Sequence, residues 1–501
     1  MRHDQTIVVG GGTAGCAVAG RLAEAGEHVV LIEAGPDFGP ADAGRWPQAL
    51  LDPSIMPVDQ HSWGYTNSGI DGHAPLALQR ARVIGGCSSH NGCAVVWGHR
   101  ADYDAWEAAG NPGWGAAGMI PYLSMANQRL RVSIPDIDEL TPFHQLVIAS
   151  APGVGLPPIA DFSNLDETHG LGPGPVNISE RRRWNTSFAY LDPVREMTNF
   201  TLMPDTLVDR LLLDGDRVIG VAARGPSGTQ AIRSSRVVLA GGAYGTPLLL
   251  QRSGIGDPSD IEAQGIYVQV ELPGVGRNLQ DHPALSVDYT GTPDLTRMLD
   301  DFVSQGGLPR EEGTIGLFSS RRCEGPFDMH LYPIAHRNGP GDWNVFIASA
   351  VMAPRSTGTI AIAGVDPETP PRIEHRYLSD TQQYDLDALV DGLHMARSLG
   401  ASEPLASLIG TEIGPFADCR TDEQIRARIP LHSAHDYHPA STCKMGPPTD
   451  PLAVVDATGA VYGVGGLHIA DASIFPSVTW ANTNLPVLAA AEKIAAGLLA
   501  S

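Results

Sequence analysis

The sequence predicts an α/β lobe with a parallel sheet, interleaved with an α+β lobe built on an antiparallel sheet with helices. Near the N-terminus, two short strand-like runs flank a glycine-rich turn and an alanine-rich helix, which is the order of a βαβ unit. A continuous apolar run at residues 237–240, followed by glycines, is typical of a buried parallel strand. Runs at 343–351 and 358–363, separated by Pro, Gly and Asp turns and followed by a helical pattern at 381–399, predict the antiparallel sheet.

The N-terminal unit, residues 6–33, has the spacing of a dinucleotide-binding motif. We expect Gly10 to permit the tight turn, Gly12 to let backbone amides approach a pyrophosphate, and Gly15 to let the helix pack closely on the strand. Glu33 ends the second strand, where a carboxylate accepts hydrogen bonds from a ribose 2′-hydroxyl. The first lobe is therefore predicted to be Rossmann-like and to bind NAD or FAD, and the motif alone does not choose between them.

Composition argues against two classes of partner. The 33 Lys and Arg residues against 56 Asp and Glu residues give a net charge of −23, which repels nucleic acid and anionic membrane surfaces. No stretch has the roughly 18 consecutive apolar residues of a membrane span, and the N-terminus has no secretory signal pattern. Six cysteines without a CxxC pair are typical of a reducing compartment. We therefore expect a cytoplasmic enzyme without nucleic-acid or membrane partners.

Three histidines, His432, His435 and His438, recur at intervals of three residues, which raises the possibility of a metal site. Pro439 disfavours a regular helix through His438, so the three side chains are not expected to share a helical face. No Cys or acidic cluster completes a ligand set. We expect no metal site here.

Several separated blocks of the chain carry a family resemblance. They are ARVIGGCSSHNG at residues 81–92, GAYGTPLLLQRSGIG at 242–256, GVGRNLQDHP at 274–283, and the C-terminal region from Tyr437 to Asn484. Together with the N-terminal motif, they resemble the signatures of the glucose-methanol-choline (GMC) oxidoreductases, which are FAD-dependent enzymes that act mostly on alcohols. The resemblance spans nearly the whole chain and implies FAD rather than NAD.

The resemblance also implies a division of the chain and a reaction. The FAD-binding domain is expected to comprise residues 1–145, 186–285 and 446–501, and the substrate-binding domain residues 146–185 and 286–445. The implied reaction is oxidation of a small alcohol to an aldehyde or ketone, with O₂ or another acceptor reoxidising the flavin. A lyase that splits cyanohydrins without net redox, a sugar or polyol oxidase or dehydrogenase, and a flavin-binding protein without turnover remain as alternatives. A homodimer is also compatible with the sequence.

The resemblance implies the following site residues. His438 falls on the position of the catalytic base, and Asn482 falls on a second catalytic position that is His or Asn in the family. A histidine is the natural acceptor of a hydroxyl proton near neutral pH, and an amide can hold the developing alkoxide. The expected FAD-binding residues are Gly10, Gly12, Thr13, Ala14, Gly15, Glu33, Ala34, Arg82, Gly85, Gly86, His90, Asn91, Gly92, Val208, Asp471, Ala472, Asn482 and Thr483.

His90 departs from the aliphatic residue that most of the family carries. Its surroundings are similar to those in the choline-oxidising members, in which this histidine is bonded to the flavin 8α-methyl carbon, so a covalent flavin is possible here. Gly92 stands where those members have a serine near flavin N5, which leaves more room. We expect the helix that begins near Leu485, capped by Asn484, to direct its positive end toward the flavin.

The sequence does not identify the alcohol. A quaternary ammonium site needs an aromatic cage and a carboxylate, and aromatic residues are only 6% of the chain. The resemblance maps no cation-binding carboxylate onto this sequence, although Glu311 and Glu312 lie in the same lobe. The aromatic candidates for a pocket are Trp63, Tyr65, Trp97, Trp343 and Phe346.

Overall fold

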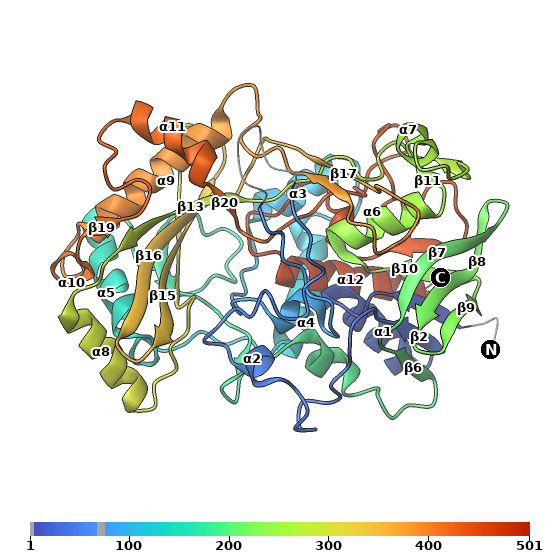
Figure 1. Ribbon diagram of the computed structural model, residues 1–501, viewed down its shortest axis with the longest axis horizontal. Helices are drawn as coiled ribbons and strands as arrows, with labels where there is room; N and C mark the ends of the chain where they lie inside the picture. The colour runs from blue at the N-terminus through green and yellow to red at the C-terminus, as the bar shows by residue number, and fades with distance from the viewer. Residues whose placement is uncertain (1–4, 68–75, 501) are drawn as a thin grey trace.

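The computed structural model describes residues 5–67 and 76–500 and contains two large sheets. The first is a five-stranded parallel sheet in the order β21-β10-β1-β2-β6. Its strands are β1 (Thr6–Val9), β2 (Val29–Ile32), β6 (Phe200–Met203), β10 (Arg236–Leu239) and β21 (Leu467–Ile469). Segments from the two ends and the middle of the chain thus meet in one sheet, which confirms the predicted Rossmann-like α/β fold (Figure 1).

Helices that contain many small, apolar residues cover the parallel sheet. Helix α1 (Thr13–Glu24) packs against α12 (Asn484–Ala500), and α12 packs against α4 (Ala116–Arg129). The alanines of α1 and α12 are almost all buried, so the helices approach closely without long side chains between them. Helix α6 (Gly242–Arg252) follows β10 directly, and a three-stranded antiparallel sheet of β7 (Leu207–Asp214), β8 (Arg217–Gly225) and β9 (Gly228–Arg233) extends this lobe.

The second large sheet is antiparallel, in the order β19-β13-β16-β15-β14-β3, with β20 also paired to β13. Helix α9 (Tyr384–Gly400) packs on β13 and β16, and a separate hydrophobic cluster lies between sheet and helix. The predicted antiparallel sheet with a helix is therefore present. The strands are β3 (Gly170–Pro173), β13 (Pro283–Tyr289), β14 (Thr314–Phe318), β15 (Met329–Gly339), β16 (Asp342–Val351), β19 (Glu412–Ile413) and β20 (Ala434–His435).

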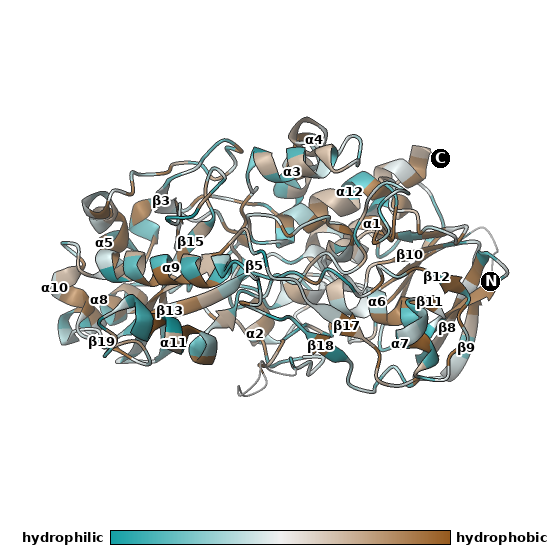
Figure 2. Ribbon diagram, turned by 90° about the horizontal axis from the view of Figure 1, so that it is seen from above, coloured by the Kyte–Doolittle hydropathy of each residue, from teal (hydrophilic) through white to brown (hydrophobic). Residues whose placement is uncertain are grey.

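The remaining elements are short or peripheral. In Figure 2 the elements of the parallel and antiparallel sheets lie at opposite ends of the long axis of the molecule. None of the helices in the described ranges is long and apolar enough to cross a bilayer. The other elements are α2 (Gln48–Leu51), α3 (Arg100–Ala108), α5 (Pro142–Ser150), α7 (Pro258–Glu262), α8 (Pro293–Ser304), α10 (Ala406–Ile409), α11 (Asp422–His432), β4 (Ile178–Ser179), β5 (Arg182–Arg183), β11 (Ile255–Gly256), β12 (Val270–Glu271), β17 (Thr359–Ala361) and β18 (Arg372–Glu374).

Two details differ from the sequence-based expectation. Within residues 5–67 and 76–500, strand β17 pairs only with β18. It packs on α6, because Ile360 is buried in a cluster with Tyr244 and Leu248 instead of joining the antiparallel sheet. Strand β13 belongs to the antiparallel sheet along its whole length, so the expected boundary between residues 285 and 286 falls inside a strand. The division of the chain into the expected segments stays a prediction.

Candidate active site

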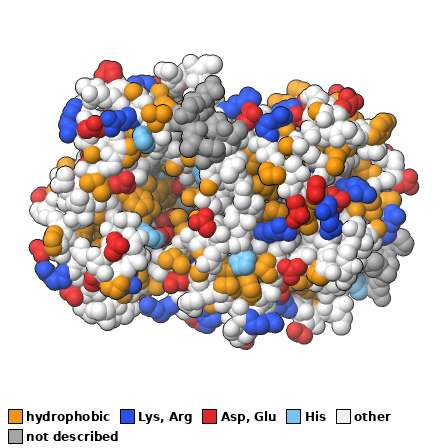
Figure 3. Space-filling model, viewed as in Figure 1, with side chains coloured by type: hydrophobic (Ala, Val, Ile, Leu, Met, Phe, Trp, Pro, Cys, Tyr) orange, Lys and Arg blue, Asp and Glu red, His pale blue; other side chains and the backbone are white. Residues whose placement is uncertain are grey.

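A cavity of about 540 Å³ runs from the glycine-rich turn after β1 to the antiparallel sheet. Its walls come from the ends of β1, β2 and β10, the start of α12, and strands β13, β15 and β16 of the other sheet. Figure 3 shows a hollow with largely hydrophobic walls in the left half of this face. The carboxyl ends of parallel strands are where ligands bind in open α/β sheets, so the position of the cavity is that of a cofactor site joined to a second chamber.

The glycine turn leaves room for a ligand on one side only. Gly10 has a φ of +99°, and a Cβ there would lie 2.5 Å from the carbonyl oxygen of Ala240. A Cβ on Gly15 would collide with the carbonyl oxygen of Gly10, so this glycine lets α1 pack on β1. A Cβ on Gly12, by contrast, would meet only Gly86 Cα, at 3.8 Å, and would occupy the cavity. The turn therefore fits a pyrophosphate at the N-terminus of α1.

The Glu33 carboxylate accepts hydrogen bonds from the protein backbone, and the residue also lines the cavity. Its Oε2 accepts a hydrogen bond from the amide of Gly11 and its Oε1 one from the amide of Gly35, both at 2.7 Å. Burial raises the pKa of Glu33 to about 7, although these amides oppose the shift. The carboxylate thus shapes the turn, and its hydrogen bond to a ribose stays a prediction.

The segment around His90 forms a second cradle opposite α1. Gly85 has a φ of +84° and donates its amide to Gly11, which ties the two turns together. The His90 side chain is buried, and its Nδ1 has no hydrogen-bond partner among the described residues. Arg183, also fully buried, donates to the carbonyl oxygen of Asn91 at 2.9 Å and fixes the following turn. An unpartnered, buried ring nitrogen beside the cavity fits a group that the protein alone does not contain.

Most of the predicted FAD-binding residues line the cavity. Three of them, Gly15, Gly85 and Arg82, do not line it. Arg82 instead donates a hydrogen bond to the carbonyl oxygen of Ala34 at 3.3 Å and so holds the adjacent backbone. Asp471 is bonded within the protein, since its Oδ2 accepts from the Gly242 amide at 2.8 Å. The predicted residues that line the cavity are Gly10, Gly12, Thr13, Ala14, Glu33, Ala34, Gly86, His90, Asn91, Gly92, Val208, Asp471, Ala472, Asn482 and Thr483.

The two predicted catalytic side chains converge at the far end of the cavity. Asn482 Nδ2 lies 3.5 Å from His438 Nε2, and both residues line the cavity wall. The loop that carries His438 is held by Asp281, whose Oδ1 accepts the backbone amide of His438 at 2.8 Å. Helix α11 ends at His432, and the chain then forms β20. The three spaced histidines therefore do not share a helical face, as expected.

A hydrogen-bonded chain orients the Asn482 amide. The hydroxyl of Tyr332 on β15 donates to Asn482 Oδ1 at 3.3 Å and lies 2.8 Å from His330 Nδ1. Burial and the charge of His438 lower the pKa of His330 to about 3, so His330 is neutral and its Nδ1 donates to the tyrosine. Because Asn482 Oδ1 is occupied in this way, the NH₂ group faces His438. Sequence reasoning did not find Tyr332 or His330, which lie more than a hundred residues from either catalytic position.

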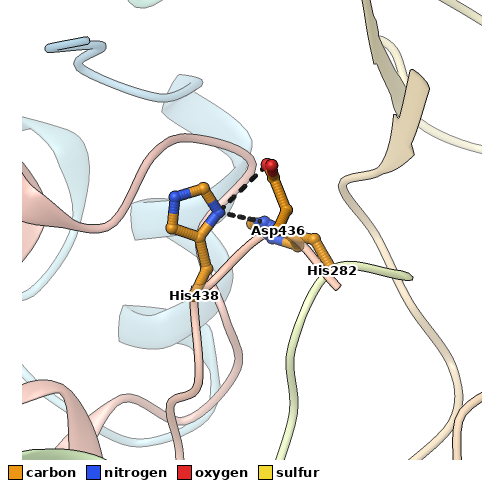
Figure 4. A group of neighbouring side chains, drawn as sticks. All are labelled: His282, Asp436 and His438. Carbon is orange, nitrogen blue, oxygen red and sulfur yellow. Dashed lines mark hydrogen bonds and ion pairs between the residues drawn. The ribbon is translucent and has the colours of Figure 1, made fainter. Parts of the chain in front are cut away.

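His438 is contacted on its other side by His282 and Asp436, as Figure 4 shows. His438 Nδ1 is 3.0 Å from His282 Nδ1 and 3.2 Å from an Asp436 carboxylate oxygen. Burial and His438 lower the pKa of His282 well below its usual value, so that ring is neutral. Ligand atoms of these three residues lie within 4.8 Å of one another. The two Nδ1 atoms are close because one of the rings donates an N–H hydrogen bond and the other ring accepts it. The absence of a metal site stays a prediction.

Glu312 also reaches the cavity, at the end near His438. It precedes β14, and a Cβ on Gly92 would collide with its carboxylate. Of the aromatic candidates from the sequence, Trp63, Tyr65 and Phe346 line the cavity. Trp97 and Trp343 do not: their indole nitrogens donate to Asn127 and Asp300. The sequence placed Glu312, with Glu311, in the substrate-binding lobe and assigned it no role.

The start of α12 faces the same cavity. Asn484 is the first helical residue, not the residue before the helix as expected, and the Thr13 hydroxyl lies 3.4 Å from its Oδ1. Asn484 and Val487 both line the cavity. The positive end of the α12 dipole is thus available to stabilise negative charge there.

The chain matches known proteins along its whole length. The family model described as GMC oxidoreductase matches twice, at residues 4–284 and 354–491. Mitochondrial choline dehydrogenase from Homo sapiens is 33% identical over 98% of this chain and 88% of its own length. Choline oxidase from Arthrobacter globiformis is 32% identical over 99% of this chain and 94% of its own length.

A solved structure supports the same assignment. Pyridoxine 4-oxidase from Mesorbium loti has a TM-score of 0.86 at 26% sequence identity, and the match covers 99% of both chains. The relatives are oxidoreductases, so the lyase alternative has no support among them. The chain therefore belongs to the GMC oxidoreductase family, and it is an FAD-dependent oxidoreductase that acts on the CH–OH group of an alcohol.

Proposed function

We propose that His438 and Asn482 are the catalytic pair of this enzyme. The observation that carries the proposal is the convergence of His438 Nε2 and Asn482 Nδ2, 3.5 Å apart, on the cavity wall. A substrate hydroxyl placed against both atoms gives its proton to Nε2, while the amide N–H donates to the oxygen as negative charge develops there. Bound FAD supplies the acceptor for the hydride that leaves the substrate carbon.

The contacts on the other side of His438 suit a base at Nε2. A neutral histidine that accepts a proton at Nε2 carries its own proton on Nδ1, and this proton is donated to His282 Nδ1, 3.0 Å away. Once His438 has taken the substrate proton, its positive charge lies 3.2 Å from Asp436. The carboxylate stabilises this charged form in a site that is largely shielded from water.

The FAD-binding roles predicted for the cavity residues are proposed on the same basis. The amides at the N-terminus of α1, beside Gly12 and Thr13, would hold the pyrophosphate, and Glu33 would hold the ADP ribose. The turn from Gly86 to Gly92 and the segment at Asn482 and Thr483 would enclose the rest. The glycine cradle and the unpartnered His90 nitrogen support this fit.

Anaerobic mixing with alcohols tests the proposed reaction. We expect at least one alcohol among amino, aryl, aliphatic and sugar alcohols to bleach the flavin absorbance. An aerobic screen with peroxide detection, repeated with a dye acceptor, then distinguishes an oxidase from a dehydrogenase and a simple alcohol from a sugar or polyol. If every alcohol leaves the flavin oxidised, the proposed reaction is wrong.

Tyr332→Phe is expected to slow the reaction without weakening substrate binding much. The change removes the hydroxyl that donates to Asn482 Oδ1, so the amide can rotate away from His438. One neutral hydrogen bond contributes about 0.5–1.5 kcal/mol, so kcat should fall about 2- to 13-fold. Single-turnover flavin reduction measures this. An unchanged rate with a raised KM would show that Tyr332 contacts the substrate and does not position Asn482.

A covalent bond between His90 and the flavin is also proposed. Support comes from its burial and from its unpartnered Nδ1 at the cavity. The bond would join one ring nitrogen to the 8α-methyl carbon, each partner losing a proton, and the two electrons released would pass through the flavin to the acceptor used in turnover. We expect acid-precipitated enzyme to keep its yellow colour and His90→Ala precipitate to lose it. Colour left entirely in the wild-type supernatant excludes the bond.

A reducing, cytoplasmic location is proposed from the cysteines. All six are free thiols, and four of them are buried. Burial raises the pKa of Cys16 to about 12, which makes that thiol unreactive. A homodimer also stays a prediction.

A further inference from the structure

His438 lies in an irregular stretch of an otherwise antiparallel pairing. The segment before it, β20, pairs with β13, with His435 opposite Pro283, and the segment after it pairs again, with Ala440 opposite Gln280. Five steps along the chain from His435 to Ala440 face three steps from Gln280 to Pro283, so the side that carries His438 has two extra residues. Extra residues of this kind form a β-bulge, which turns a side chain away from the regular direction of the strand.

Two neighbouring residues of the facing segment hold this bulge. Asp281 is buried, and its Oδ1 accepts the backbone amide of His438 at 2.8 Å. The backbone of Gln280 exchanges two hydrogen bonds with the backbone of Ala440, of 3.2 Å and 2.9 Å. A substitution of the Gln280 side chain leaves these backbone groups in place, so the bulge itself does not depend on that side chain.

The other member of the proposed pair lies in a loop with few hydrogen bonds of its own. Among the residues that the structure describes, no amide of residues 477–483 donates to a backbone carbonyl oxygen. The Val478 amide donates instead to Gln280 Oε1 at 2.8 Å. The Trp480 amide donates to a second side chain, through Asp102 Oδ2 on α3, at 2.9 Å. The position of this loop therefore depends on side chains from other parts of the chain.

Gln280 contacts the segments of both catalytic residues. Its backbone pairs with the segment of His438, and its side chain accepts the amide of Val478, four residues before Asn482. Gln280 itself is not among the residues that line the cavity. Its effect on a substrate would therefore pass through His438 and Asn482, whose 3.5 Å separation depends on how the two segments are spaced.

We propose that Gln280 is a positioning residue that fixes the distance between His438 and Asn482. This role rests on the proposed function, since it takes these two residues as the catalytic pair. The hydrogen bond from the Val478 amide to Gln280 Oε1 keeps the Asn482 loop against the His438 bulge, so that both polar groups meet one substrate oxygen. A displacement of about 1 Å in such an arrangement costs as much as about 100-fold in rate.

Gln280→Leu tests this role, because it nearly keeps the size of the side chain and removes the acceptor oxygen. We expect kcat for anaerobic flavin reduction by an alcohol to fall about 10- to 100-fold, with KM changed less, because the geometry matters most in the transition state. Gln280→Glu keeps an oxygen that accepts the Val478 amide and should stay within about 3-fold of the wild-type rate. If Gln280→Leu is as fast as the wild type, or Gln280→Glu is as slow as Gln280→Leu, the hydrogen bond does not position the pair.

A double-mutant cycle separates this role from the proposed function. Asn482→Ala by itself should slow flavin reduction, and adding Gln280→Leu to it should slow reduction by less than about 3-fold more, because the group to be positioned is already gone. A further loss of about 10- to 100-fold in the double variant shows that Gln280 acts elsewhere and overturns the positioning role. An unchanged rate in Asn482→Ala alone contradicts the catalytic pair, which is a failure of the proposed function.

Gln145→Leu is the matched control. Gln145 is half-buried like Gln280 and donates to a backbone group, the carbonyl oxygen of Leu140, at 2.8 Å, but it lies on α5 and does not line the cavity. Both Leu variants should lose some thermal stability, measured as Tm, whereas slow flavin reduction is expected for Gln280→Leu alone. Equal slowing in both variants assigns the effect to a general loss of stability and rejects the positioning role.

A crystal structure of FAD-bound Gln280→Leu gives a measurement without turnover. We expect the separation of His438 Nε2 and Asn482 Nδ2 to increase from 3.5 Å by about 1 Å, the displacement that accounts for the slower reaction. The backbone pairing of residue 280 with Ala440 should stay intact, since it does not involve the side chain. A pair that keeps its wild-type separation in this variant contradicts the proposal.

Discussion

His438→Ala is expected to reduce the rate of flavin reduction by alcohol by about 10²- to 10⁴-fold, the usual contribution of a general base. The side chain lies on the cavity wall with Nε2 3.5 Å from Asn482 Nδ2, and no other base in the described chain contacts this amide. The rate is measured by anaerobic stopped-flow spectroscopy at saturating alcohol. KM should change less than kcat, because the proton is transferred only in the transition state.

The control is His169→Ala, which removes an exposed histidine whose ring nitrogen Nε2 is hydrogen-bonded to the Gly155 carbonyl oxygen. This variant should reduce its flavin at the wild-type rate. The flavin content of His438→Ala should equal that of the wild type, since the backbone amide that Asp281 holds is unchanged. A His438→Ala enzyme with normal flavin content and an unchanged reduction rate would remove His438 from the mechanism.

Gly12→Val is expected to yield a folded protein that purifies nearly colourless. The backbone of Gly12, with φ −80° and ψ −163°, is one that valine adopts readily. A Cβ there meets only Gly86 Cα, at 3.8 Å, so the larger side chain extends into the cavity where the pyrophosphate is expected. Overpacking of about 1–3 kcal/mol corresponds to about 5- to 150-fold weaker FAD binding. The flavin-to-protein absorbance ratio measures it.

Gly497→Ala is the matched control, because Gly497 lies within α12 and an added Cβ meets nothing within 4 Å. It should keep its flavin and gain slightly in stability, since alanine is the better helix former. Far-UV circular dichroism should be the same for both variants. Full flavin content in Gly12→Val would show that the pyrophosphate does not lie over this turn.

The cofactor lobe could be predicted closely because its signals are local. Gly10 and Gly15 are required by contacts with backbone a few residues away or with the adjacent strand, so the motif and the fold agree. The helix predicted at 381–399 begins three residues later, at Tyr384, because Gln383 adopts a left-handed conformation with φ +54°. Boundaries of this kind depend on single backbone angles that residue patterns do not report.

The substrate side of the site could not be predicted in the same way. Tyr332, Glu312 and Asp436 come from separate segments of the chain, and the fold brings them to the walls of the cavity that His438 also lines. Strand β17 shows the same limit, since its apolar pattern fits either lobe and packing against α6 decides which one. Residues separated by a hundred positions carry no shared pattern in a single sequence.

The sequence by itself determined the family, the flavin cofactor and the two kinds of sheet, and it predicted the catalytic pair, because each is encoded in short blocks whose residues act together. Tertiary structure alone decided what surrounds that pair. It oriented the Asn482 amide through Tyr332, placed Asp436 behind His438, and brought Glu312 to the cavity wall. The physical reason is that hydrogen bonds and burial depend on distances between strands, which are set only when the whole sheet has formed.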